Sequence, residues 1–184
     1  MDKKFDLKSL NIKAFARERI QLQGERALSL FTRLSDLKFQ EPEHSMLESQ
    51  VSWDIRGECL TLAGGEDQHW LYLQANLMMP LQCQRCMSPL LESVTSQQAF
   101  RFVADETVAE VEDEESEEDV LVLSSDMDVW ELIEDELIMA VPLVPKHAVC
   151  PTQVAMSVAD EAFEAAQEAR PNPFAALAKL KQTP

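Results

Sequence analysis

Residues 70–86, WLYLQANLMMPLQCQRC, decide the fold of this chain. Apolar residues stand at every second position in Leu71, Leu73, Ala75 and Leu77, which is the period of a β-strand with one buried face. The strand leads directly into Cys83 and Cys86. This stretch therefore predicts a sheet whose central strand ends at a pair of thiols.

Strand patterns also flank this stretch on both sides. Val51, Trp53 and Ile55 alternate with polar residues, and a glycine pair at 64–65 supplies a turn before the next strand. After the second cysteine, Ser88-Pro89 supplies turn chemistry, and residues 90–103 are rich in strand-forming residues. Because short turns join successive strands, antiparallel pairing is the economical topology. We predict an α+β fold with an antiparallel sheet, either a meander or a small open barrel.

The remaining helical patterns lie mostly after the strands. Ser125 is predicted to cap a helix with Asp128 in the capping-box position, and Pro142 ends it. Its acidic residues are interpreted as a solvated side, opposite an apolar face of Trp130, Ile133, Leu137 and Val141. Two further helices are expected near 157–169 and 173–181, and a short one within 26–37. The segment around Phe174 is either a helix that caps the core or a peptide that docks on a partner.

Charge is distributed unevenly along the 184 residues, whose net charge is −17. Residues 1–40 hold nine basic and five acidic residues, a net charge of +4. Residues 105–119 hold ten acidic residues and no basic one, and like charges at that density repel one another. We predict that this acidic block is a disordered loop. The alternative is that it mimics nucleic acid or docks on a basic ribosomal protein.

Length and composition favour one domain over 1–184, with the hydrophobic fraction of 46% that is typical of a globular chain. We divide it into a basic segment (1–45), a β region (46–104), the acidic loop (105–119) and a helical part (120–184). No apolar run is long enough to cross a bilayer, and the first residues lack the apolar core of a signal peptide. A cytoplasmic protein with no membrane association and with reduced cysteines is therefore expected.

The chemistry of the chain is concentrated in Cys83-x-x-Cys86 and His147-x-x-Cys150. Three thiolates and one imidazole form the soft tetrahedral ligand set that suits a structural zinc ion. Two alternatives remain: reduced thiols that help to pack two loops, or thiol–disulfide chemistry. The redox alternative is the weaker one, because such a motif usually begins a helix, and here a turn and a strand follow it.

Other candidate residues point to binding and not to catalysis. Arg85, between the two cysteines, would present a planar guanidinium that suits phosphate or carboxylate, or it is an ordinary solvated arginine. His147 has no neighbouring serine or aspartate constellation to serve as a general base. No phosphate-binding glycine loop, metalloprotease motif or nucleophile elbow is present in the sequence. We therefore expect a protein that is not an enzyme and has no small-molecule substrate.

Three ordered motifs together resemble a known family. They are residues 81–86 (LQCQRC), a helix at 134–138 that leads into Pro142-x-x-Pro145-x-His147, and residues 171–181 (PNPFAALAKLK). They resemble the YceD family of bacterial proteins, the large ribosomal RNA subunit accumulation proteins. The match runs from the strand region to the C-terminus, and residues 1–45 match only loosely. Zinc is not implied by this resemblance and rests on the spacing of the ligands alone.

The resemblance implies a non-enzymatic ribosome biogenesis factor that supports the synthesis, processing or stability of 23S rRNA. It could hold precursor RNA directly, with basic residues of the N-terminal third, among them Lys3, Lys4, Arg17 and Arg19, on the phosphates. Arg85 and either Trp70 or Trp53 would then be available for stacking. It could instead bind a large-subunit assembly protein through its acidic surface, with Phe174 among the contact residues. The alternatives from other classes are a zinc-stabilised protein-interaction adaptor without an RNA role and, further behind, a thiol–disulfide protein.

Overall fold

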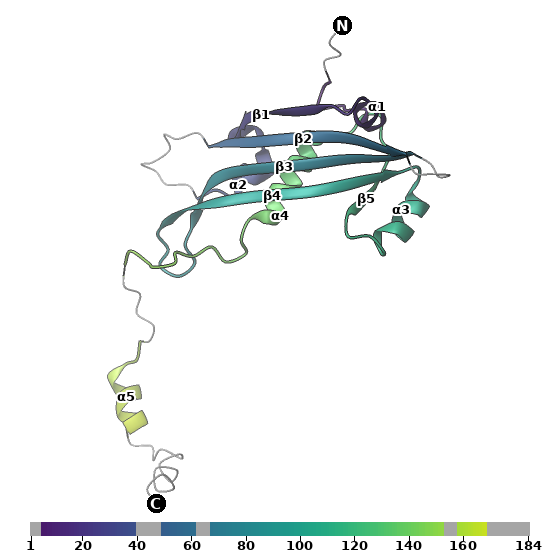
Figure 1. Cartoon of the computed structure of the whole chain (residues 1–184). Coiled ribbons are helices and arrows are strands. Elements are labelled where there is room, and N and C mark those ends of the chain that lie inside the picture. The colour runs from purple at the N-terminus through teal and green to yellow at the C-terminus, as the bar shows by residue number, and fades with distance from the viewer. Residues whose placement is uncertain (1–4, 40–48, 62–66, 153–157, 169–184) are drawn as a thin grey trace, which may run out of the picture.

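The protein is a curved five-stranded sheet with helices packed on one side (Figure 1). The computed structural model describes residues 5–39, 49–61, 67–152 and 158–168. Strand order follows the chain, β1-β2-β3-β4-β5. The strands are β1 (Gln21–Ala27), β2 (Gln50–Thr61), β3 (Asp67–Gln82), β4 (Pro89–Val103) and β5 (Asp119–Val122). The helices are α1 (Ile12–Glu18), α2 (Thr32–Asp36), α3 (Glu106–Asp113), α4 (Val129–Ala140) and α5 (Glu161–Glu168), with a 3₁₀ turn at Leu28–Leu30.

The predicted α+β class is confirmed, and the sheet is a meander that does not close into a barrel. The first four strands pair antiparallel with their neighbours in sequence. The last strand, β5, pairs parallel with β4, so the sheet is mixed. Parallel pairing requires a crossover, and α3 lies in the connection between the two strands. None of the described helices is long and apolar enough to cross a membrane.

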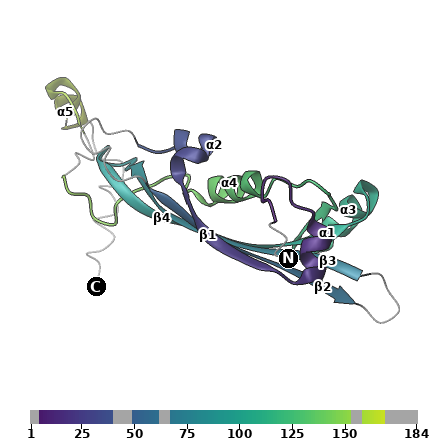
Figure 2. The same ribbon diagram turned by 90° about the horizontal axis from the view of Figure 1, so that it is seen from above.

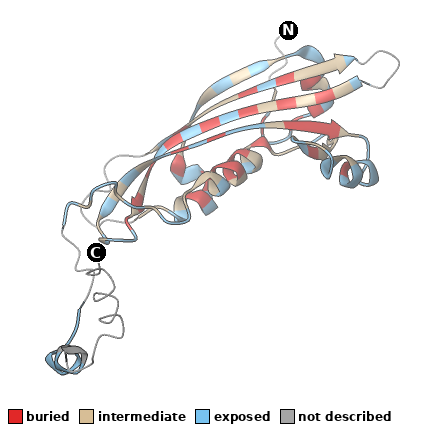
Figure 3. Ribbon diagram, turned by 60° about the horizontal axis from the view of Figure 1, so that its bottom comes forward, coloured by how far each residue is buried: buried red, intermediate tan, exposed pale blue. Residues whose placement is uncertain are grey.

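Burial alternates along the strands, as the sequence period requires. Leu71, Leu73, Ala75 and Leu77 of β3 are all buried, and the residues between them are more exposed (Figure 3). We call the buried side the covered face, because α2 and α4 lie on one side of the sheet (Figure 2) and α4 contacts β3 and β4. The opposite side is the open face, and it carries the following residues, all at least partly exposed: Asp54, Arg56, Trp70, Tyr72 and Gln74.

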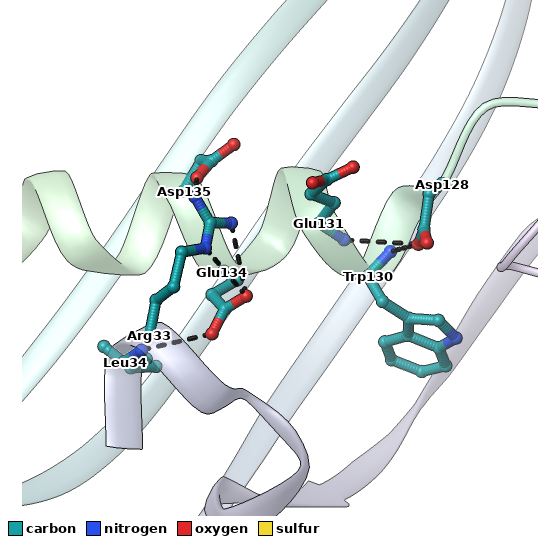
Figure 4. Close-up of polar contacts among 7 residues, drawn as sticks. All are labelled: Arg33, Leu34, Asp128, Trp130, Glu131, Glu134 and Asp135. Atoms are coloured by element: carbon teal, nitrogen blue, oxygen red, sulfur yellow. Dashed lines mark hydrogen bonds and ion pairs between the residues drawn. The ribbon is translucent and has the colours of Figure 1, made fainter. Parts of the chain in front are cut away.

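Helix α4 differs from its prediction at the N-terminus and in its acidic residues. The N-cap is Asp128, whose carboxylate accepts hydrogen bonds from the backbone N–H groups of Trp130 at 3.0 Å and Glu131 at 3.3 Å (Figure 4). Ser125 is not the cap. Ile133 and Leu137 are buried as predicted, but Glu134 and Glu136 are buried as well. The expectation of a uniformly solvated acidic side is therefore wrong.

Both buried carboxylates have partners, which explains how α4 can carry them on its packed side. Glu134 accepts from the backbone N–H of Leu34 at 3.1 Å and from Arg33 (Figure 4). Glu136 accepts from the hydroxyl of Ser96 at 3.1 Å, and its burial raises the pKa of the carboxyl group. Glu136 thus joins α4 to β4 of the sheet, and Glu134 joins α4 to α2.

The acidic segment 105–119 forms a helix where the sequence predicted a disordered loop. Asp105 caps α3 by accepting from the backbone N–H of Val108 at 3.0 Å. The buried Arg101 of β4 forms ion pairs with Glu112 and with Glu118, the latter at 2.9 Å. One buried cation thus binds both α3 and the residue just before β5, a contact that the run of like charges in the sequence does not predict.

The N-terminal region contains two elements that the sequence did not predict, α1 and β1. The expected short helix within 26–37 is present as the 3₁₀ turn and α2. Of the two expected C-terminal helices, the first is α5, shorter than predicted, and the second lies outside the described residues.

Helix α1 packs so closely on β2 that a glycine is required at the contact. A Cβ atom built on Gly57 would lie 2.7 Å from Phe15 Cδ1 and 2.8 Å from the Phe15 carbonyl oxygen. We expect Gly57→Ala to lower the free energy of unfolding by about 1–3 kcal/mol, because the backbone of α1 must move away. Gly24→Ala should lower the free energy of unfolding by less, since a Cβ atom on Gly24 would meet only the Trp53 side chain, at 2.9 Å. Urea unfolding of both variants checks this, and equal stability of wild type and Gly57→Ala would contradict the packing.

Candidate metal centre

The turn between β3 and β4 carries the first two candidate ligands, Cys83 and Cys86. The backbone N–H of Cys83 donates to the carbonyl of Ser88 at 3.0 Å, and that of Met87 donates to the carbonyl of Cys83 at 2.9 Å. Met87 adopts the left-handed region, with φ of 60°, directly after the second cysteine. This conformation is uncommon for a residue with a side chain, and here it closes the turn that carries both thiols.

The segment after α4 supplies the other half of the centre. Its extended course begins at Val141, because the residue before a proline is disfavoured in the helical region. The backbone N–H of Gln84 donates to the Pro145 carbonyl at 2.8 Å, and the Arg85 guanidinium donates to the His147 carbonyl. Figure 1 shows this segment running past the β3–β4 turn. Two segments distant in sequence are thus held together by one backbone and one side-chain hydrogen bond before any metal is considered.

The predicted ligands meet at this junction. One possible ligand atom from each of Cys83, Cys86, His147 and Cys150 lies within 4.8 Å of all the others. Sulfur atoms bound tetrahedrally to zinc at about 2.3 Å lie roughly 3.8 Å apart, so a small contraction would complete the coordination shell. Cys83 is fully buried, and the other three are partly exposed. These residues lie close enough to bind a metal ion.

The orientation of His147 also fits metal ligation. Its Nδ1 atom faces the Cys86 sulfur at 3.4 Å, and its Nε2 atom lies 3.1 Å from the carbonyl oxygen of Pro89. If Nε2 carries the proton and donates to that carbonyl, Nδ1 is left with a lone pair directed at the thiols. Metal-binding histidines commonly donate their second ring N–H to a carbonyl in this way.

The electrostatics of the cluster favour thiolates. Burial acts to raise the pKa of Cys83, but hydrogen bonds from three backbone N–H groups outweigh it and lower the pKa to about 5. Those groups belong to Arg85, Cys86 and His147, the last at 3.4 Å from the sulfur. The backbone N–H of Ser88 lowers the pKa of Cys86, whereas burial raises that of Cys150. Hydrogen bonds to Cys83 and Cys86 raise the pKa of His147. The negative charge favoured at Cys83 and Cys86 suits a divalent cation.

Of the residues proposed to contact RNA or a partner, the structure describes Arg17, Arg19 and Arg85, and Arg85 lies at the opposite end of β3 from the other two. Arg85 lies between Cys83 and Cys86 and donates to the carbonyl of His147, although its side chain is exposed. Arg17 forms an ion pair with Asp67 at 3.6 Å, and Arg19 donates to the Cys59 carbonyl at 3.3 Å. Lys3, Lys4 and Phe174 lie outside the described residues. The sequence identified the ligand types, but it gave no signal for the left-handed Met87 or for the carbonyl of Pro89.

Comparison with known proteins shows that the cluster lies in a region of the chain that matches a protein family. Residues 71–181 match the model of the family described as large ribosomal RNA subunit accumulation protein YceD, and this range contains all four candidate ligands. The protein of that name from Haemophilus influenzae is 35% identical over 105 residues. The matched part is 55% of this chain and spans 59% of the length of that curated relative. No solved structure matches the chain.

Proposed function

Because this chain belongs to the YceD family, the large ribosomal RNA subunit accumulation proteins, we propose that it is a non-enzymatic factor that supports the synthesis, processing or stability of 23S rRNA. The observation that carries this proposal is the family match over 71–181. This range contains most of β3, all of β4, the cysteine turn and the segment after α4. The matched region contains all four candidate metal ligands.

Within this function we favour contact through a protein of large-subunit assembly over direct contact with RNA. The net charge of −17 opposes the approach of phosphates, which requires clustered Lys and Arg. Of the basic residues considered for RNA, Arg17 and Arg19 already bind Asp67 and the Cys59 carbonyl within the protein. An acidic protein of this kind is better suited to a basic protein partner.

The proposed role of the cluster is to hold a structural zinc ion. The ligands would be the thiolates of Cys83, Cys86 and Cys150 and Nδ1 of His147, and their approach to within 4.8 Å supports this assignment. Zinc, as a Lewis acid, would accept a lone pair from each of the four ligands and so join the β3–β4 turn to the segment after α4. Since all four positions are filled by protein atoms, the proposed centre is structural and leaves no open position for a substrate.

The cellular test is a gradient analysis of ribosomes from cells that lack the protein. The proposal expects a deficit of large subunits and of mature 23S rRNA, both restored by the wild-type chain. RNA crosslinking to the tagged protein separates the two modes. Normal ribosome profiles in the deletion strain would reject the proposed function.

A charge variant distinguishes direct RNA contact from contact through a partner. Neutralising Lys3, Lys4, Arg17 and Arg19 together should leave large-subunit accumulation unchanged, because the favoured mode makes no phosphate contacts there. If the protein binds RNA directly, the same change should reduce the slope of log affinity against log salt concentration by about four. We would measure complementation and the slope of RNA affinity against salt, after confirming by urea unfolding that the variant folds. Loss of complementation in a folded variant would favour direct RNA contact.

A further inference from the structure

The open face of the sheet carries two parallel aromatic rings. Trp70 and Tyr72 stand two residues apart on β3, and their ring centroids are 6.0 Å apart with an interplanar angle of 10°. They line a cavity of about 630 Å³, together with Gln74 and residues of β2 and β4. Neither ring belongs to the hydrophobic core, which lies on the covered face. Two large aromatic side chains are thus placed outside the core, where they can contact a partner.

The protein itself shows which chemical group this face accepts. Arg56, opposite Tyr72 in the sheet register, places its guanidinium carbon 4.4 Å from the centroid of the Tyr72 ring. The same guanidinium pairs with Glu58 at 3.2 Å. An arginine on this face therefore has a ring to lie over and a carboxylate to pair with, which is the combination that planar guanidinium groups favour.

Carboxylates surround the cavity. Asp54, Glu117 and Glu118 line it along with the two rings. Glu118 is held there by the buried Arg101, whose single positive charge is offset by its ion pairs with Glu112 and Glu118. Among the described residues that line the cavity, Arg56 is the one cation, and it is already paired with Glu58. The cavity is consequently an aromatic site with an excess of negative charge.

This charge decides between two occupants that aromatic rings could accept. Bases of single-stranded RNA stack on such rings, but their phosphates would lie against the carboxylates. The guanidinium groups of a basic polypeptide gain from both features. We propose that the surface formed by Asp54, Glu58, Trp70, Tyr72, Glu117 and Glu118, which we call the aromatic–acidic surface, docks an arginine-rich segment of a protein partner. This inference rests on the proposed function insofar as it states where an assembly partner would bind.

The direct test is peptide binding by the purified full chain. The probe is a fluorescent peptide of alternating arginine and serine, with matched lysine–serine and glutamate–serine peptides and a single-stranded RNA of similar length. The arginine peptide should bind most tightly, because a guanidinium stacks on the rings better than an ammonium does. This experiment involves no ribosome, so it can fail while the cellular function holds, and the reverse is also possible.

Variants locate the binding. Trp70→Leu and Tyr72→Leu should each weaken binding of the arginine peptide about tenfold and reduce its advantage over the lysine peptide. Neutralising Asp54 and Glu117 together should weaken binding of both basic peptides. The matched control is Asp36→Asn with Glu131→Gln, an equal change of charge at exposed residues of α2 and α4, and it should have little effect. Urea unfolding shows which variants are folded.

Arg56 provides a test in the opposite direction. Because its guanidinium lies over Tyr72 and pairs with Glu58, Arg56→Ala should free both groups and tighten binding of the arginine peptide several-fold. Lys8→Ala removes an equal charge from an exposed residue outside the aromatic–acidic surface and should change the affinity much less. A role of Arg56 in stability alone would not produce this gain.

Three results would overturn the inference. Binding that responds equally to the surface variants and to their charge-matched controls would be nonspecific attraction to an acidic protein. Tighter binding of the RNA than of the arginine peptide, lost in Trp70→Leu, would assign the surface to RNA. No measurable binding of the arginine peptide by the folded wild type at low salt would leave the surface without the proposed partner.

Discussion

Cys83→Ser is expected to remove the bound metal and to lower the melting temperature by on the order of 10 °C. With free zinc about a thousandfold above its dissociation constant, binding would contribute about 4 kcal/mol to the folded state. For a chain of this size, each kcal/mol corresponds to about 2–4 °C. Cys83 is the most buried of the four ligands, so a hydroxyl there would also replace a thiolate that accepts three backbone hydrogen bonds. Metal analysis of the purified protein and thermal unfolding provide the measurement.

The chain contains its own control for this experiment. Cys59 is the fourth cysteine, it lies in β2, and it does not belong to the ligand cluster. Cys59→Ser should therefore retain one equivalent of zinc. A wild-type protein purified with zinc present that contains no metal, and that melts at the same temperature with and without a chelator, would contradict the assignment and leave only the packing role for these thiols.

Acid should release the metal, and the cluster indicates the order of events. The pKa of His147 is raised by its hydrogen bonds with the thiols, so this ligand takes up a proton at a higher pH than an ordinary histidine does. Cys83, with a pKa of about 5, keeps its thiolate to lower pH. Zinc-dependent stability should therefore be present near neutral pH and be lost as the pH falls toward about 5. Because Cys150 has a raised pKa, zinc binding near neutral pH should also release its proton.

The parts of this fold that could be predicted from the sequence are those with a strong local period or an unusual ligand chemistry. The alternation through Leu71 and Leu73 predicted β3, and the apolar spacing of Ile133 and Leu137 predicted α4. Cysteine and histidine residues are few in this chain, so two short motifs were enough to identify four candidate ligands that the fold brings together. Each of these predictions depends on properties that neighbouring residues share.

What could not be predicted depends on contacts between distant residues. In β1, only Leu22 is a strongly apolar residue on the covered side, and Gly24 is there because Trp53 of β2 fills the space beside it. The acidic segment is ordered by Arg101, which belongs to another element. For α1 a local signal did exist, since Asn11 caps it by accepting from Ala14 N–H at 2.8 Å, but seven residues give too short a period to detect.

Glu134 has a structural role that only the tertiary structure reveals, and its removal should lower the free energy of unfolding. Helix α2 has no side-chain cap of its own, because its N-cap residue is Phe31. Glu134 of α4 supplies the missing acceptor through Oε1, which receives the Leu34 N–H at 3.1 Å, while Oε2 receives Arg33 at 3.2 Å (Figure 4). One carboxylate from α4 thus caps α2 and joins the two helices.

We expect Glu134→Ala to lower the free energy of unfolding by about 2–3 kcal/mol. The variant leaves the buried Leu34 N–H without an acceptor, which alone costs roughly 1–3 kcal/mol, and it also removes buried methylene groups. Glu134→Gln retains an oxygen for that N–H and should lose less. Asp135→Ala removes the other carboxylate bound to Arg33, at 2.6 Å, but this pair is half exposed and its loss should be small. Urea unfolding of the three variants gives the ranking, and a loss in Asp135→Ala equal to that in Glu134→Ala would show that pairing with Arg33, and not capping of α2, is what Glu134 contributes.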